Sequence, residues 1–358
     1  MKNFYLFFKG GLATFLVVSL SLFACISVKP ELLMGWVTLF LVSMVPTQMI
    51  ISLLWRCEYP QFIAVLQQPV RGLMFILFTL IAGCIIGFGA LKFIGGNISP
   101  PTPFVNMYLI FTVPIALWLI IPFQAWPLKL IFKNQGTLGI ALMVSTYVLA
   151  YLLFQILFSF GFLSEAPFYR KMLDPDGLYM AWNPLALSIA TVAIVLIFVL
   201  LDFWPITALS KVFPSITKQP LFGIANLLLT ALTVFLMWFC FVVWGGMDVV
   251  TFQTEVCVSL IFGLFIVLIM FEGLPVMNLF QPFRGLIMTA IACVIAKGML
   301  NLYQAVLLNN FLLASGRPTY SMEIWLASSM LAVTFPTMVM YANYLQFWPL
   351  STSNLKIE

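Results

Sequence analysis

Long apolar runs alternate with short polar stretches along the whole chain. Most of these runs hold close to 20 residues, the length at which an α-helix crosses the apolar core of a bilayer. Short segments of alternating polarity, which form membrane β-barrels, do not occur. The pattern predicts an all-α polytopic membrane protein with about ten transmembrane helices, at 1–27, 33–55, 72–95, 106–125, 138–161, 184–204, 222–244, 256–271, 285–311 and 322–347.

The polar corners on one side of these helices resemble one another. In the clearest copy, Phe271 to Gly285, an acid is followed by a proline and then by Gln-Pro-x-x-Gly. Related corners recur, with Gly replacing the second proline in one copy and only the first half present at the end of the chain. Their first prolines lie 67, 78, 70 and 74 residues apart, at Pro60, Pro127, Pro205, Pro275 and Pro349. Such a spacing indicates an internal repeat.

Each repeat is expected to be a two-helix hairpin within one transmembrane domain. A proline after an apolar run ends the helix because it has no N–H group. The second proline suits the first turn of the next helix, and the Gln before it is expected to cap that turn. The resulting five units of the single domain 1–358 are 1–60, 61–127, 128–205, 206–275 and 276–349, followed by a polar tail at 350–358.

Composition and charge agree with this architecture and orient it. The chain is 63% hydrophobic and only 8% charged, whereas soluble domains carry about 25% charged residues. Ten basic residues fall on the side of the corners and five on the other. The positive-inside rule therefore predicts that the corners and both termini are cytoplasmic. We expect a bacterial-type inner membrane, with the first run kept as an uncleaved span rather than removed as a signal peptide.

Several classes of chemistry are not indicated. The chain has no histidine, which removes His-ligated metals and imidazole bases. Its six cysteines stand apart, mostly in apolar runs, where a thiol packs like a small hydrophobe. Phosphate-binding loops, nucleophile elbows and zinc spacings are absent from the sequence. We expect no cofactor, no metal and, because the basic residues are dispersed, no nucleic-acid partner; the lipid bilayer is the expected environment.

The sharpest single candidate is Lys297, near the middle of the ninth predicted span. A charge at that depth is costly and usually faces a cavity or a partner. Asn301 and Gln304 follow at i+4 and i+7, on the same helix face. The stripe predicts a polar seam inside the bundle that serves as a solute or ion path. The alternative is a lysine that reaches the interface or bonds carbonyls for assembly only.

Helix breakers stand at matching positions in several spans. Pro46, Pro114 and Pro336 precede their corner prolines by 14, 13 and 13 residues. Interrupted helices at corresponding points mark binding sites in transporters, although prolines also occur in membrane helices without that role. The path candidates beside these breaks are Pro46, Thr47, Gln48, Pro336 and Thr337.

Charged residues gather at the cytoplasmic corners. The acids Glu58, Asp202 and Glu272 stand near Arg71 and Arg284, among other basic residues. Exposed ion pairs between neighbours are the simple interpretation. Docking of a cytoplasmic partner is the alternative.

The sequence is compatible with three functions. The kinked repeats and the Lys297 stripe favour a transporter or channel-like permease for a small solute. The sparse polar interior and short loops also suit a non-catalytic subunit of a larger membrane complex. An enzyme acting on lipids is the third and least favoured interpretation, because it needs an acid–base pair at the interface, where only the corner acids, Asp174 and Asp176 stand.

Overall fold

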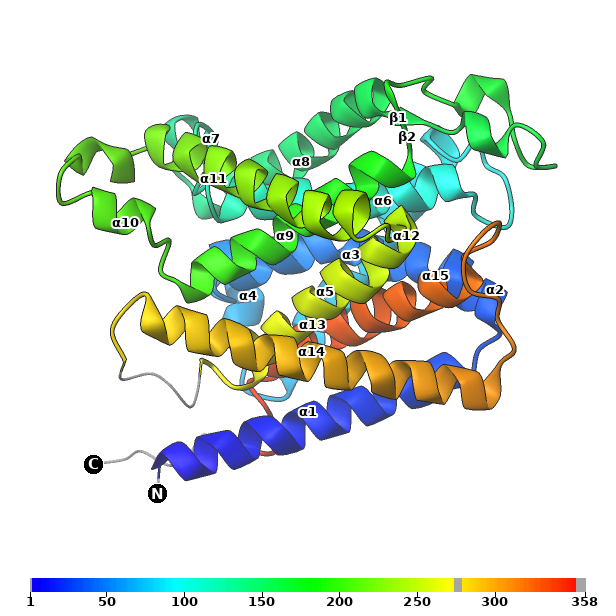
Figure 1. The fold of residues 1–358 in the computed structure, drawn as a ribbon. Coiled ribbons are helices and arrows are strands. Elements are labelled where there is room, and N and C mark those ends of the chain that lie inside the picture. The colour runs from blue at the N-terminus through cyan, green and yellow to red at the C-terminus, as the bar shows by residue number, and fades with distance from the viewer. Residues whose placement is uncertain (1, 274–278, 352–358) are drawn as a thin grey trace.

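The computed structural model describes residues 2–273 and 279–351 (Figure 1). Ten of its helices are long and apolar enough to cross a membrane. The predicted class and number of spans are therefore confirmed. Pro275, one of the repeated prolines, and most of the predicted polar tail (352–358) lie outside the described residues.

The even-numbered spans form an inner layer. In each of them 56–72% of the most apolar window is buried inside the protein. Three of the five change from α-helix to π-helix along their length, and we name each by its main α-helix. The α3 span comprises α2 (Pro30–Leu32), η1 (Leu33–Val37), α3 (Thr38–Met49) and η2 (Ile50–Leu54), and the next two spans are the single helices α6 (Pro103–Ile120) and α9 (Trp182–Leu200). The α13 span comprises α12 (Val249–Thr251), η7 (Phe252–Val258), α13 (Ser259–Phe265) and η8 (Ile266–Met270). The α16 span comprises α15 (Ser321–Ala327), η9 (Ser328–Thr334), α16 (Phe335–Val339) and η10 (Met340–Tyr344).

The odd-numbered spans form an outer layer, with 11–39% of the corresponding window buried. Their remaining surface carries large exposed apolar side chains, as expected of helices in contact with lipid. Only one of the five contains a π-helical segment among the described residues. These helices are α1 (Lys2–Ile26), α5 (Val70–Phe93), α8 (Gln135–Leu157), α11 (Leu221–Trp238), which continues into η6 (Phe239–Trp244), and α14 (Phe283–Asn310).

The inner spans form a closed ring in the order of the chain. The α3 span packs against α6, α6 against α9, and α9 against the α13 span. The α13 span packs against the α16 span, which returns to α3. The hydroxyl of Tyr5 donates to the carbonyl oxygen of Leu350 at 2.9 Å, so both ends of the described chain lie on the side of the corners.

Each outer helix packs in a groove between two inner spans by one rule. Near the start of each outer helix, a glycine lies against the corner end of an inner span. That inner span comes three spans earlier in the chain, when the ten spans are numbered in order and the first is taken to follow the tenth. A Cβ atom on Gly285 of α14 would lie 2.9 Å from the carbonyl oxygen of Leu200 at the end of α9. The equivalent contacts pair Gly10 with Met270, Gly72 with Tyr344, Gly139 with Trp55, and Gly223 with Phe123.

The glutamines of the Gln-Pro-x-x-Gly corners make this contact specific. The side-chain oxygen of Gln281 accepts from the N–H of Gly285 at 3.1 Å, and its side-chain nitrogen donates to the carbonyl of Leu200 at 2.9 Å. The predicted capping role of the glutamine is therefore confirmed. Gln68 makes the same two bonds, accepting from the N–H of Gly72 and donating to the carbonyl of Tyr344. Gln219 likewise accepts from the N–H of Gly223 and donates to the carbonyl of Pro122.

The inner spans also end alike. Two successive residues with positive φ follow each helix, a conformation that closes a helix C-terminus but is uncommon for side chains other than glycine. In the α9 span these are Asp202 (φ 49°) and Phe203 (φ 57°), and the N–H of Phe203 donates to the carbonyl of Phe198 at 2.7 Å. The other pairs are Arg56 and Cys57, Gln124 and Ala125, Glu272 and Gly273, and Gln346 and Phe347.

The corners and loops differ in detail from the sequence-based expectation. Short helices run between the layers at three corners: α4 (Gln61–Ala64), α7 (Leu128–Ile131), and α10 (Ile206–Leu209) with η5 (Pro214–Thr217). The longest loop on the face opposite the corners holds η3 (Gly161–Leu163), η4 (Lys171–Leu173) and a minimal parallel pair of strands, β1 (Phe158–Ser159) and β2 (Tyr179–Met180). The eighth span begins at Val249 rather than 256, because Asp248 caps it by accepting from the N–H of Val250 at 2.9 Å.

Candidate functional site

The ring of inner spans encloses a cavity of about 570 Å³. All five inner spans contribute lining residues, and the outer helices contribute none. The loops opposite the corners supply the rest of the lining, including Pro101, Phe168 and Pro318. The cavity therefore runs from the face opposite the corners toward the middle of the bundle.

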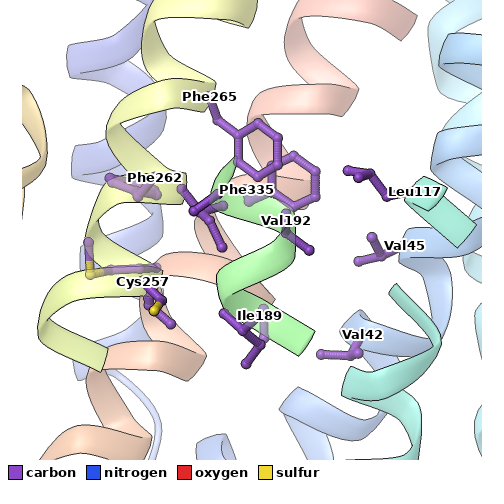
Figure 2. Packing of buried hydrophobic residues seen from close by; sticks show 14 of the residues in the cluster. Val42, Val45, Leu117, Ile189, Val192, Cys257, Phe262, Phe265 and Phe335 are labelled. Carbon is purple, nitrogen blue, oxygen red and sulfur yellow. The ribbon is translucent and has the colours of Figure 1, made fainter. Parts of the chain in front are cut away.

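Two stacked aromatic rings close the inner end of the cavity. Phe265 of α13 and Phe335 of α16 have ring centroids 4.0 Å apart and an interplanar angle of 17°. Figure 2 shows the two rings together at the centre, with Val192 beside them and Val45 facing them across the ring of helices. Toward the corners the interior is filled by buried apolar side chains, including Leu196, Val267 and Met338. Among the described residues, none between these two rings and the corners lines the cavity.

The polar side chains of the cavity lie in its outer half. Glu323, at the start of α15, is 2% exposed, and Gln253 in η7 is 5% exposed. The carboxylate oxygen Oε1 of Glu323 accepts from the Ser315 hydroxyl at 2.6 Å and from the N–H of Gly316 at 3.0 Å. Asn106 of α6 donates to the carbonyl of Met34 at 3.2 Å. Glu31, at the start of the α3 span, completes the group.

A charged cluster stands beside the mouth of the cavity. The hydroxyl of Tyr320 donates to Asp248 at 2.9 Å and accepts from Arg317 at 3.0 Å. The hydrogen bond to Tyr320, together with the carboxylate of Asp248, raises the pKa of the Arg317 guanidinium above its ordinary value. The cluster joins the last two loops on this side, so it fixes the rim from which Pro318 and Thr319 reach the cavity.

The helix-breaking residues lie at the depth where the cavity ends. Pro46, Thr47 and Gln48 are buried but do not line the cavity. Gln48 donates to the carbonyl of Pro336 at 3.4 Å, and this bond joins the two broken helices. Thr47 donates to the sulfur of Met143, and Thr337 bonds back to its own helix at Val333. Of these three bonds, only that of Gln48 links two inner spans, since Thr47 contacts the outer helix α8 and Thr337 contacts its own helix, while Pro114 lines the cavity.

The expected polar seam around Lys297 does not form inside the bundle. Lys297 and Asn301 are exposed and Gln304 is half-buried, all on the outward face of α14. The buried face of this helix consists instead of residues such as Ala292, Ala296 and Leu300. Among the ion pairs of the described residues, none involves Lys297. The interior placement was wrong because α14 belongs to the outer layer, which the polar stripe alone does not reveal.

The corner charges form different contacts from those expected. Glu272 pairs with Lys9 at 3.4 Å rather than with Arg284, and Lys9 also lies 4.3 Å from the ring centre of Phe347. Arg71 donates to the carbonyl of Cys57 at 2.6 Å. Asp202 accepts from Gln281 at 2.8 Å, and Glu58 is exposed. These charges hold the corners to neighbouring spans.

Asp174 and Asp176 of the longest loop are occupied by structural contacts. Asp174 accepts from the N–H groups of Phe160 and Asp176 and from the Tyr169 hydroxyl, at 3.0, 3.0 and 2.8 Å. Asp176 pairs with Lys171. Across residues 2–273 and 279–351, no group of three or more His, Cys, Asp or Glu side chains is placed to hold a metal.

Glu323, Gln253 and Asn106 were not among the predicted site residues. The tenth predicted span, 322–347, includes Glu323 but assigns it no role, and the eighth predicted span begins after Gln253. A partial signal was present, since all five even-numbered spans carry an acid or an amide at the end opposite the corners: Glu31, Asn106, Asn183, Gln253 and Glu323, of which Asn183 does not line the cavity.

The chain was compared with protein-family models, curated proteins and solved structures, and nothing in any of the three matches it.

Proposed function

We propose that this chain is a permease that moves a small solute along the axis of the inner ring. The supporting observation is the cavity, which is built by all five inner spans and ends on the stacked rings of Phe265 and Phe335. Cavities enclosed by membrane helices near mid-depth are typical of solute sites in transporters. The two rings act as the closed gate in this proposal.

The repeated contacts support a common origin for the ten helices. Glycine docking and paired left-handed residues recur around the ring, and glutamine bonds recur at three corners. We infer that five copies of one two-helix unit assemble with their inner helices facing a shared axis. The excess of basic residues at the corners supports a cytoplasmic position for that side and for both termini, in a bacterial-type inner membrane.

Opening the gate requires the inner spans to shift. The α3, α6 and α16 spans contain interior prolines, and the α3, α13 and α16 spans contain π-helical turns. Both features weaken the regular hydrogen bonding of a helix and are frequent at functional sites. The outer helices, docked by their glycines, provide the frame against which the inner spans move.

The gate is tested by removing one ring. Phe335→Ala and Phe265→Ala should raise the conductance of proteoliposome-derived planar bilayers well above that of the wild type. The matched control is Phe262→Ala, which removes the same volume from α13 beside Tyr303, outside the cavity. Conductance that stays at the wild-type level in both gate variants, with folded protein confirmed by gel filtration, would contradict the proposal.

A second candidate function, as a subunit of a larger membrane complex, is supported by the exposed position of Lys297. This lysine is the fifteenth residue of the 28 in α14, so it stands about 21 Å from the helix start at 1.5 Å per residue. An ammonium group exposed at that depth is costly unless it meets a partner. In a subunit of a larger membrane complex, a transmembrane helix bearing a carboxylate would supply that partner.

A second copy of this chain does not fit that role. None of its 11 acids stands in the middle third of a span, and the deepest, Glu255, is only the seventh residue of Val249–Met270. The test is purification from native membranes with a photo-crosslinker at Asn301. A crosslinked partner should carry Asp or Glu at mid-span and be lost in Lys297→Leu but kept in Lys92→Leu, which alters a lysine at a helix end. Equal crosslinking in both variants would reject this candidate.

A further inference from the structure

The charged side chains that line the cavity are acidic. Glu31 and Glu323 are its only charged lining residues within the described chain, and neither Lys nor Arg lines it. This contrasts with the whole chain, which carries 16 basic and 11 acidic residues. The lining therefore presents negative charge and no positive charge, and the guanidinium of Arg317 at the rim is paired with Asp248.

Glu323 is held through one carboxylate oxygen, and the other oxygen has no partner. Ser315 and Gly316 both donate to Oε1, whereas Oε2 is buried and has no hydrogen-bond partner. A buried carboxylate oxygen without a donor is costly in a protein interior. Because Glu323 lines the cavity, a donor or a cation brought by a ligand would satisfy this oxygen.

Two neighbouring amides add further unpaired acceptors. The hydroxyl of Thr254 donates to the backbone oxygen of Glu323 at 3.5 Å, which brings η7 and its Gln253 beside α15. The side-chain oxygens of Gln253 and Asn106 are buried and have no partner. Three residues from three different inner spans thus line one cavity, and each keeps a buried acceptor without a partner.

The interior prolines free further backbone acceptors in residues that line the cavity. A proline cannot donate to the carbonyl four residues earlier. Pro46, Pro114 and Pro336 therefore leave the carbonyls of Val42, Ile110 and Ala332 without their usual helical donor. All three of these residues line the cavity. Carbonyls freed in interrupted membrane helices commonly coordinate cations in transporters.

The remaining wall favours an organic cation over a metal ion. It is mostly aliphatic and aromatic, with Trp182 and Phe168 toward the mouth and Phe335 at the closed end. Aromatic faces attract ammonium groups, whereas a metal such as calcium needs six to eight oxygen ligands in one shell. The volume of about 570 Å³ suits a small molecule with apolar substituents.

We propose that the cavity binds a monovalent organic cation of the substituted-ammonium class, with Glu323 as its counter-charge. The cation enters from the face opposite the corners, its charge lies near the Glu323 and Gln253 oxygens, and its apolar part fills the space down to Phe265 and Phe335. This names the solute class of the permease proposed above and rests on that proposal for transport, but not for binding.

Binding is measured on the full chain in nanodiscs by titration calorimetry. The probe is benzyltrimethylammonium, and its size-matched opposite is phenylmethanesulfonate. The wild type should bind the cation saturably and show no binding of the anion. Equal affinity for the two probes, or none for the cation, would overturn the proposal, and this comparison needs no variant.

Variants then assign the site. Glu323→Gln should weaken cation binding at least about tenfold, because it removes a buried counter-charge. Glu272→Gln, which neutralises an acid at a corner, should leave affinity unchanged. Unchanged affinity in a folded Glu323→Gln variant would reject the assigned residue. Cation binding without gated flux would reject the permease alone, whereas gated flux without cation binding would reject this inference alone.

Discussion

The two layers of helices have nearly the same hydropathy but differ in how much of their surface is buried inside the protein. The most apolar windows of the outer spans have mean hydropathies of 1.8–2.4 and those of the inner spans 1.4–2.4, yet 11–39% of the outer windows and 56–72% of the inner ones are buried. Apolar residues are needed equally to face lipid and to fill a protein interior. Hydropathy therefore locates spans but does not assign them to a layer.

The layers differ instead in where their backbones are disturbed. The outer helices carry glycine near their starts, where they press on the ends of inner spans. The inner spans carry the interior prolines and most of the π-helical segments, of which η1, η7 and η9 lie at the depth of the cavity and η2, η8 and η10 at the corner ends. The outer layer is thus built for fixed contacts, and the inner layer for a backbone that is irregular around a cavity.

The largest expected effect comes from adding one methyl group at an outer-helix start. In Gly285→Ala the new Cβ would lie 2.8 Å from the Cα of Leu201 and 2.9 Å from the carbonyl oxygen of Leu200. Because backbone atoms cannot move aside cheaply, we expect a loss of about 1–3 kcal/mol in the free energy of unfolding. The measurement is thermal or denaturant unfolding in a mild detergent.

Gly298→Ala on the same helix is the matched control. Nothing lies within 4 Å of the position its Cβ would take. Alanine is the better helix former, so this variant should be as stable as the wild type or gain up to about 1 kcal/mol. If both substitutions had the same effect, the distinction between the docking face and the lipid face of α14 would be lost.

A smaller loss is expected when a corner glutamine is removed. Gln281→Leu deletes the bond from the N–H of Gly285 and those to Leu200 and Asp202. Loss of this cap should cost about 1–2 kcal/mol in the free energy of unfolding. Gln304→Leu, on the outward part of the same helix, should cost nothing in the same unfolding assay. Comparable losses in the two variants would show that the corner bonds do not contribute specifically to the free energy of unfolding.

The sequence was sufficient for features that depend on local chemistry. The number of spans followed from apolar length, and the glutamine cap followed from unpaired N–H groups at a helix start. Lys297 shows the limit, since a polar stripe predicts that one face of a helix is special but not whether that face points inward. Its direction depends on the order of helices around the ring, which is set by contacts such as that of Gly285 with the end of α9.

The cavity residues were hidden for a related reason. Glu323 and Gln253 stand near the outer ends of their spans, where polar residues usually belong to loops. They are buried only because five spans converge there and loops cover them. Phe265 and Phe335 are two of 36 phenylalanines in the chain, and only the ring closure brings them together.

The central claim, that the inner ring encloses a solute path, is tested most directly by cysteine accessibility in a variant lacking the six native cysteines. Ala332→Cys lines the cavity, and Gly298→Cys stands on the lipid face of α14 near the middle of its helix. A water-soluble cationic methanethiosulfonate, added to proteoliposomes on the side opposite the corners, should modify Ala332→Cys and leave Gly298→Cys unmodified. Modification of Ala332→Cys no faster than that of Gly298→Cys would contradict the account.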